Sequence, residues 1–101
     1  MIKSNLYIPH QEIVNFCRAN RIRRLALFGS VLREDFTPSS DVDVLVEFDK
    51  DARVGLIRLA ALEMELSQLL GRKVDLNTPG FLSKYYRKRI LSEAEVQYDA
   101  A

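Results

Sequence analysis

The chain has 101 residues and a mass of 11.6 kDa, enough for one hydrophobic core and too little for two, so we expect a single domain over residues 1–101. Hydrophobic residues make up 48% and charged residues 29%, which are ordinary proportions for a globular domain and exclude a disordered chain. The 15 Lys and Arg residues nearly balance the 14 Asp and Glu residues, so overall charge provides no general attraction to nucleic acid or to an anionic membrane.

Hydrophobic periodicity and turn residues predict alternating helices and strands. Apolar residues three and four apart, bounded by Pro9 or by Gly71, indicate helices, whereas Val-rich or alternating segments indicate strands. In chain order we expect a helix over 10–19, a strand over 22–28, a short helix over 30–34, a strand over 41–48, a helix over 54–70, a strand over 73–77, a helix over 79–91 and an edge strand over 95–98. This order predicts an α/β (α+β) sandwich, in which helices cover a small mixed sheet.

The chain lacks the sequence features of secreted and membrane proteins. Cys17 is the single cysteine, which excludes an internal disulfide, and its apolar neighbours indicate a core residue in a reducing compartment. No segment reaches the roughly 18 apolar residues of a membrane span, and the N-terminal segment lacks the apolar region of a secretory signal. We therefore expect a cytoplasmic protein without a membrane partner.

Asp41 and Asp43 open the predicted strand 41–48 and are the first candidate site residues. Residues two apart in a strand point to the same face, with Cα atoms about 6.6–6.8 Å apart. Such carboxylates can share two divalent ions about 3.5–4 Å apart, the geometry of two-metal phosphoryl transfer, and their hard oxygen atoms favour Mg²⁺. The alternative is chance, because Asp-x-Asp pairs and a Ser-Asp turn before a strand are both common.

Asp75 is a third candidate acid, between Val74 and Leu76 in the predicted strand 73–77. An acid between two apolar neighbours is either exposed on the open face of the sheet or held by a charged group. If it lies beside the first two carboxylates, it could be a metal ligand and the general base for an attacking hydroxyl.

Gly29-Ser30 lies between a predicted strand and a predicted short helix, where bare backbone N–H groups and a helix N-terminus favour a phosphate group. Glycine permits close approach of the backbone, and the Ser30 hydroxyl can donate a further hydrogen bond. Arg33 could contact a triphosphate, or it could fix the loop through Asp35 or Asp41. Alone, a Gly-Ser pair is more often a plain turn.

Two blocks of residues carry a resemblance to a known family. The first is Phe28-Gly29-Ser30 followed, after ten residues, by Asp41-Val42-Asp43, and the second is Lys73-Val74-Asp75-Leu76. This pattern resembles that of the nucleotidyltransferase superfamily related to DNA polymerase beta, and more closely that of the minimal nucleotidyltransferase (MNT) domain proteins. The resemblance covers nearly the whole chain and implies the polymerase beta-like nucleotidyltransferase fold.

The resemblance also implies roles for the candidate residues. It places Ser30 on the nucleotide phosphates, Asp41 and Asp43 on two Mg²⁺ ions, and Asp75 as the third acid. Many MNT proteins are antitoxins encoded beside a helical HEPN ribonuclease toxin. The resemblance therefore implies an antitoxin that transfers AMP from ATP to a tyrosine of a HEPN toxin, with which it forms a hetero-oligomer.

Two other functions stay open on the sequence alone. The chain could neutralise its partner by occlusion without catalysis, or it could add a nucleotide to RNA with the same chemistry. Three carboxylates held together against their mutual repulsion argue against occlusion.

The remaining features favour plain structural roles. Lys84, Arg87, Lys88 and Arg89 on the final helix are interpreted as a solvated face in preference to a triphosphate or nucleic-acid contact, and direct nucleic-acid binding is not expected. The aromatic residues beside them favour the core or a partner interface. Met64 is interpreted as core-facing.

Overall fold

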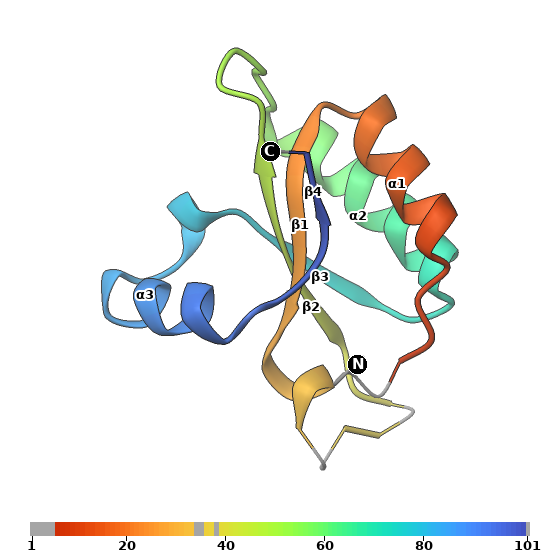
Figure 1. Cartoon of the computed structure of the whole chain (residues 1–101), viewed down its shortest axis with the longest axis vertical. Helices are drawn as coiled ribbons and strands as arrows, with labels where there is room; N and C mark the ends of the chain where they lie inside the picture. Colours follow the sequence, from red (N-terminus) through yellow and green to blue (C-terminus); the bar gives the residue numbers. More distant parts are fainter. Residues whose placement is uncertain (1–5, 34–35, 38, 101) are drawn as a thin grey trace.

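The structure is a computed structural model and describes residues 6–33, 36–37 and 39–100. Four strands form one sheet, and helices lie on both of its sides (Figure 1). The elements are α1 (His10–Ala19), β1 (Ile22–Phe28), the 3-10 helix η1 (Gly29–Leu32), β2 (Val42–Phe48), α2 (Leu56–Leu70), β3 (Val74–Asn77), the 3-10 helix η2 (Pro79–Phe81), α3 (Lys84–Glu93) and β4 (Glu95–Asp99). None of the helices in this described part is long and apolar enough to cross a membrane.

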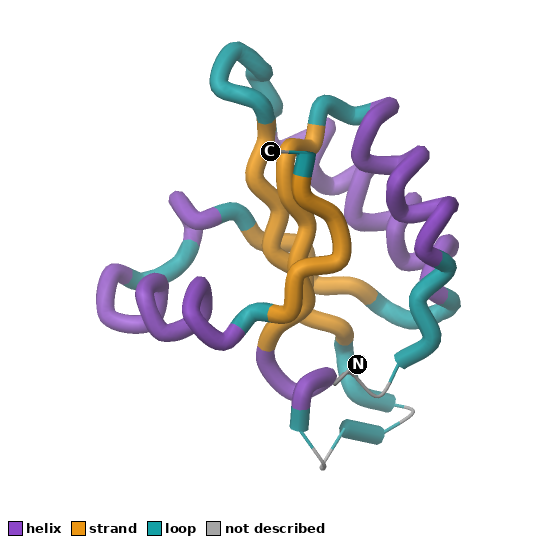
Figure 2. The backbone as a smooth tube through the Cα atoms, in the orientation of Figure 1, coloured by secondary structure: helices purple, strands orange, loops and turns teal. Residues whose placement is uncertain are grey.

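The sheet has the strand order β3-β2-β1-β4. β1 is antiparallel to both β2 and β4, whereas β2 and β3 are parallel, so the predicted small mixed sheet is confirmed. Parallel neighbours need a crossover connection, and α2 provides it between β2 and β3. Figure 2 shows α1 and α2 on one side of the sheet, with α3 and η2 on the other.

The main core lies between one face of the sheet and helices α1 and α2. The residues of β2 and β3 that face this core are Val42, Val44, Val46, Val74 and Leu76. Because side chains alternate along a strand, Asp43 and Asp75 must point to the opposite face. That face is the one beside α3.

The final predicted helix, 79–91, is divided in the structure. Pro79 starts the 3-10 helix η2, and α3 begins only at Lys84. Ser83 is the N-cap of α3, and its Oγ accepts a hydrogen bond from the backbone N–H of Tyr85 (3.3 Å), as capping serines do. The prediction of one continuous helix is therefore wrong. None of the residues of α3 is buried.

Other predicted boundaries shift by a few residues. β2 begins at Val42, so Asp41 immediately precedes the strand. α2 begins at Leu56, with Gly55 as its N-cap. The short helix after β1 is a 3-10 turn over Gly29–Leu32, and residue 34 of its predicted range lies outside the described residues.

The prediction that Met64 faces the core is wrong. Met64 is 67% exposed, and Leu56 and Ile57 at the start of the same helix are exposed as well. α2 buries Leu62 and Leu66 against the sheet, and a single layer of strands can cover only one side of the helix. The apolar residues on the other side therefore remain at the surface.

Cys17 is fully buried in α1, as predicted, and burial raises the pKa of its thiol to about 12. Since the thiolate is the reactive form, we expect iodoacetamide to modify the folded chain at pH 8 far more slowly than it modifies a free thiol. Mass spectrometry along a urea titration should show modification rising with unfolding. Rapid modification of the native chain would contradict the buried position.

Candidate active site

The turn after β1 brings Gly29 against Asp43. Phe28, the last residue of β1, pairs with Asp43 of β2, and Gly29 adopts a left-handed backbone conformation with φ +73°. A Cβ atom at residue 29 would collide with Oδ2 of Asp43. Both the backbone angle and this close approach therefore require glycine.

Asp43 lies at the centre of a group of three carboxylates. Asp75 pairs with it on the neighbouring parallel strand, so their side chains lie on the same face of the sheet. Burial raises the pKa of the Asp43 carboxyl above its ordinary value of 3.8, and the charges of Asp75 and then Asp41 raise this pKa further. The structure thus brings together the three acids that the sequence singled out. Asp75 is exposed and Asp43 is half-buried.

Two groups partly offset this negative charge: the backbone of Ser30 in η1, and the side chain of Arg33, the residue that follows η1. The backbone N–H of Ser30 donates a hydrogen bond to the Asp43 carboxylate, and the positive charge of Arg33 also lowers the pKa of Asp43. Arg33 therefore lies close enough to Asp43 for its charge to act on that carboxyl. Its suggested contacts with a triphosphate, Asp35 or Asp41 stay predictions, and Asp35 lies outside the described residues. The Ser30 hydroxyl donates a long hydrogen bond to the backbone oxygen of Asp41 (3.4 Å).

The four-residue η1 offers only a small helix dipole, because partial charges add up along a longer aligned helix. The predicted positive helix end at Ser30 is accordingly weak. A phosphate bound at this turn would depend chiefly on backbone N–H groups that glycine leaves accessible.

The donor chemistry of the three acids fits Mg²⁺, although the present side-chain positions do not form a closed metal site. Within the described ranges, no group of three or more His, Cys, Asp and Glu residues is placed to hold one metal ion. The Asp43 carboxylate accepts the Ser30 N–H, and Asp41 Oδ2 lies 3.9 Å from Lys73 Nζ. Carboxylate oxygens are nevertheless the ligands that Mg²⁺ prefers, and a cation would relieve the repulsion among them.

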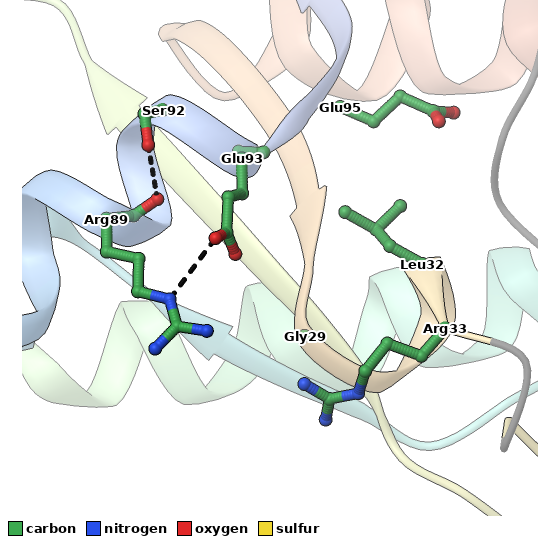
Figure 3. A pocket seen from close by; sticks show the side chains of 8 residues that line it. Gly29, Leu32, Arg33, Arg89, Ser92, Glu93 and Glu95 are labelled. Atoms are coloured by element: carbon green, nitrogen blue, oxygen red, sulfur yellow. Dashed lines mark hydrogen bonds and ion pairs between the residues drawn. The ribbon is translucent and has the colours of Figure 1, made fainter.

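A cavity of about 520 Å³ lies between the η1 turn and α3. Figure 3 shows Arg33 and Arg89 on either side of Gly29. The walls also include Leu32, Glu93 and Glu95. A neighbouring cavity of about 250 Å³ shares Gly29, Arg33 and Arg89 and adds Tyr86. The arginine side chains could contact an anionic ligand placed beside Gly29.

Arg89 is 72% exposed, as the predicted solvated face of the final helix requires, but the sequence did not indicate that it also lines this cavity. The basic residues of the final helix were the available signal. The position of Arg89 beside Gly29 depends on where the chain places α3 on the open side of the sheet (Figure 1), which local sequence does not specify. Arg89 also donates a hydrogen bond from Nε to Oε1 of Glu93 (3.2 Å), one helical turn away.

The glycine turn closed against paired acids agrees with the resemblance to nucleotidyltransferases that the sequence carries. Residues 10–96 match the family model described as a nucleotidyltransferase domain. The chain belongs to this family, and its relatives place it among the minimal nucleotidyltransferases of the protein adenylyltransferase type.

Two relatives illustrate the match in sequence. A protein of Methanocaldococcus jannaschii, to which protein adenylyltransferase activity is ascribed, is 33% identical over 84 residues, covering 83% of this chain and 88% of its own. The protein adenylyltransferase MntA of Thermococcus cleftensis is 36% identical over 72 residues, covering 71% of each chain.

Two solved structures illustrate the match in fold. A chain of a toxin–antitoxin complex crystallised with AMP-PNP superposes with a TM-score of 0.74 at 20% identity, covering 91% of this chain and 74% of that one. A chain from the complex of a tri-AMPylated HEPN toxin of Shewanella oneidensis with its MNT antitoxin gives a TM-score of 0.65 at 21% identity, covering 89% and 69%. The polymerase beta-like nucleotidyltransferase fold is thereby confirmed.

Proposed function

We propose that this chain is a catalytic antitoxin that transfers AMP from ATP to a tyrosine hydroxyl of a HEPN-type ribonuclease toxin, with Mg²⁺ as the cofactor. The observation that carries the proposal is the cluster of three carboxylates, Asp41, Asp43 and Asp75, around a glycine turn and next to a cavity with two arginines. Relatives named as protein adenylyltransferases support the reaction. The AMP-PNP complex supports ATP as the substrate, and the AMPylated toxin supports the partner.

Each residue of the site has a part in this proposal. Asp41, Asp43 and Asp75 would hold Mg²⁺, which when bound supplies positive charge for the α-phosphate and for the departing pyrophosphate. The backbone N–H of Gly29 and the hydroxyl of Ser30, together with Arg33, would hold the phosphates. These groups orient the α-phosphorus in front of the open face of the sheet, where an acceptor can approach.

The reaction itself needs one proton acceptor. The tyrosine oxygen forms a bond to the α-phosphorus, the bond from that phosphorus to the bridging oxygen breaks, and pyrophosphate leaves. The exposed Asp75 would take the proton of the tyrosine hydroxyl. Its exposure suits this part, because the acceptor belongs to another protein.

The surface around α3 supports a protein partner. Tyr85 is 92% exposed and Tyr86 is 60% exposed, and exposed aromatic residues are common at the centres of protein interfaces. The partner would complete the acceptor side of the cavity. A cytoplasmic location belongs to the same proposal, because ATP and the RNA that such a toxin cleaves are found there.

Catalysis explains why three carboxylates lie together at Asp41, Asp43 and Asp75 better than occlusion does. Burial raises the pKa of Asp43, and the charges of Asp75 and then Asp41 raise it further, so the two neighbouring carboxylates disfavour the ionised form of Asp43. A protein that acts only by covering its partner gains nothing from this repulsion. The exposed apolar residues fit either function, so they do not distinguish the two.

The proposal is tested by following the label of ATP. The chain is incubated with Mg²⁺, its neighbouring-gene toxin and ATP labelled at either the α- or the γ-phosphate. We expect the α-label on the toxin, release of labelled pyrophosphate from γ-labelled ATP, and a modified tyrosine in peptide mass spectra. Transfer of the γ-label to the toxin, or α-label found on RNA alone, would contradict the proposal.

A further inference from the structure

The segment that joins α2 to β3 lies beside the loop that precedes Asp41. α2 ends at Leu70 and is capped by Gly71, which has φ +65°, and the backbone N–H of Arg72 donates a hydrogen bond back to the oxygen of Ser67 (3.2 Å). This is a glycine-terminated helix end of the Schellman type. It fixes the direction in which the backbone of Arg72 leaves the helix.

The side chain of Arg72 holds that loop at three points. Its Nη2 donates hydrogen bonds to the backbone oxygens of Thr37 (2.7 Å) and Ser40 (2.8 Å). Its guanidinium carbon lies 4.5 Å from the centre of the Phe36 ring, within the range of a cation–π contact. Arg72 is therefore engaged with this loop through both its charge and its plane.

These contacts determine the position of Asp41 from both sides. The oxygen of Ser40 belongs to the planar peptide group that also contains the nitrogen of Asp41, so holding this oxygen orients the start of Asp41. On the other side, the N–H of Val42 donates to the backbone oxygen of Lys73 (2.8 Å). Asp41 thus lies between two anchors provided by consecutive residues of one segment.

We propose that Arg72 is a positioning residue that holds Asp41 in place for its part in the transfer reaction. An arginine suits this position because its planar guanidinium can donate to two oxygens while it stacks on a ring, which a lysine ammonium cannot do. The catalytic half of this inference rests on the proposed function. The structural half, that Arg72 orders the backbone before β2, does not.

The structural half is tested by amide hydrogen exchange in Arg72→Ala. We expect the amides of Ser40, Asp41 and Val42 to exchange about 10-fold faster or more, because two hydrogen bonds to a charged group are lost. The amides of Leu25 and Leu27 in β1 should keep their rates. Unchanged exchange at residues 40–42, or an equal acceleration throughout β1, would overturn the inference.

The catalytic half is tested by steady-state transfer rates in the same variant. We expect kcat to fall by about 10- to 100-fold, as for the loss of groups that orient a ligand, while the KM for ATP changes by less than about threefold. Arg72→Lys, which keeps the charge and N–H donors but loses the planar group that stacks on Phe36, should recover part of the loss.

Arg58→Ala is the matched control. Arg58 lies in the first turn of the same helix α2, and it also donates a side-chain hydrogen bond, to Oδ1 of Asn20. If Arg58→Ala lowers kcat as much as Arg72→Ala does, the effect is a general one and the positioning role is wrong. If the unmodified chain transfers no AMP at all, the proposed function fails, while hydrogen exchange still decides whether Arg72 orders residues 40–42.

Discussion

Asp43→Asn is expected to abolish AMP transfer, with a loss of at least about 10²- to 10³-fold, as when a group that stabilises transition-state charge is removed. The amide keeps the shape of the side chain and an oxygen that can accept the Ser30 N–H, but it lacks the negative charge that would hold Mg²⁺. Rates are measured with α-labelled ATP and the toxin. Glu47→Gln is the control, because Glu47 lies on the same strand but forms an ion pair with Arg23 (3.1 Å) and is not one of the three clustered acids.

The same substitution should stabilise the chain in the absence of Mg²⁺ at neutral pH. Since the pKa of Asp43 is raised above 3.8 in the folded chain, the folded state binds this proton more tightly than the unfolded state does. The stability of the unsubstituted chain therefore falls as pH rises from that ordinary value through the raised pKa, and the loss persists above it. Asn has no such titration.

Thermal unfolding of both proteins as a function of pH checks this sign. We expect the Tm values of the two proteins to be similar well below pH 3.8 and the Asn variant to be a few degrees more stable at pH 7. An Asn variant that is the less stable of the two at pH 7 would show that the carboxylate is stabilised by its surroundings. Activity and stability would then fall together, which repulsion among the three acids does not predict.

Gly29→Ala is expected to have the largest combined effect on stability and activity. The left-handed backbone at φ +73° disfavours an L-residue by about 1–2 kcal/mol, and the added Cβ would collide with Asp43 Oδ2. The turn or the carboxylate must move. We expect a loss of stability beyond the backbone effect alone, together with loss of transfer, measured by denaturant unfolding and by labelled ATP.

Gly71→Ala separates these two contributions. Gly71 has a similar φ of +65°, but nothing lies within 4 Å of the Cβ that alanine would add there. Its loss of stability should correspond to the backbone effect alone. Equal losses of unfolding free energy in the two variants would mean that the close approach of residue 29 to Asp43 contributes nothing.

Much of the site could be predicted from the sequence because it depends on local pattern. Alternating valines around Asp43 indicate which face of β2 is buried, and the same rule applied to Asp75 places both acids on the open face. Gly29 follows a clear strand, so a turn at that point was expected. These inferences need only the side-chain period of a strand and the conformational range of glycine.

The features that could not be predicted depend on contacts between distant segments. The exposure of Met64 depends on which side of α2 meets the sheet, and both sides of that helix carry apolar residues. Arg89 reaches the cavity because α3 lies on the open side of the sheet, near the η1 turn, and Arg72 contacts a loop 32 residues earlier. The identity of a basic residue does not indicate whether its side chain contacts water, a ligand or a backbone oxygen.

The central claim is that the chain neutralises its partner by catalysis, and the most direct test is the molar ratio needed for inhibition. A small amount of chain is incubated with Mg²⁺, ATP and a large excess of the toxin, and ribonuclease activity is measured after the chain is removed. We predict complete and lasting inactivation that requires ATP and fails with Asp43→Asn. Inhibition that needs equimolar chain, occurs without ATP and disappears when the chain is removed would contradict catalysis and establish occlusion.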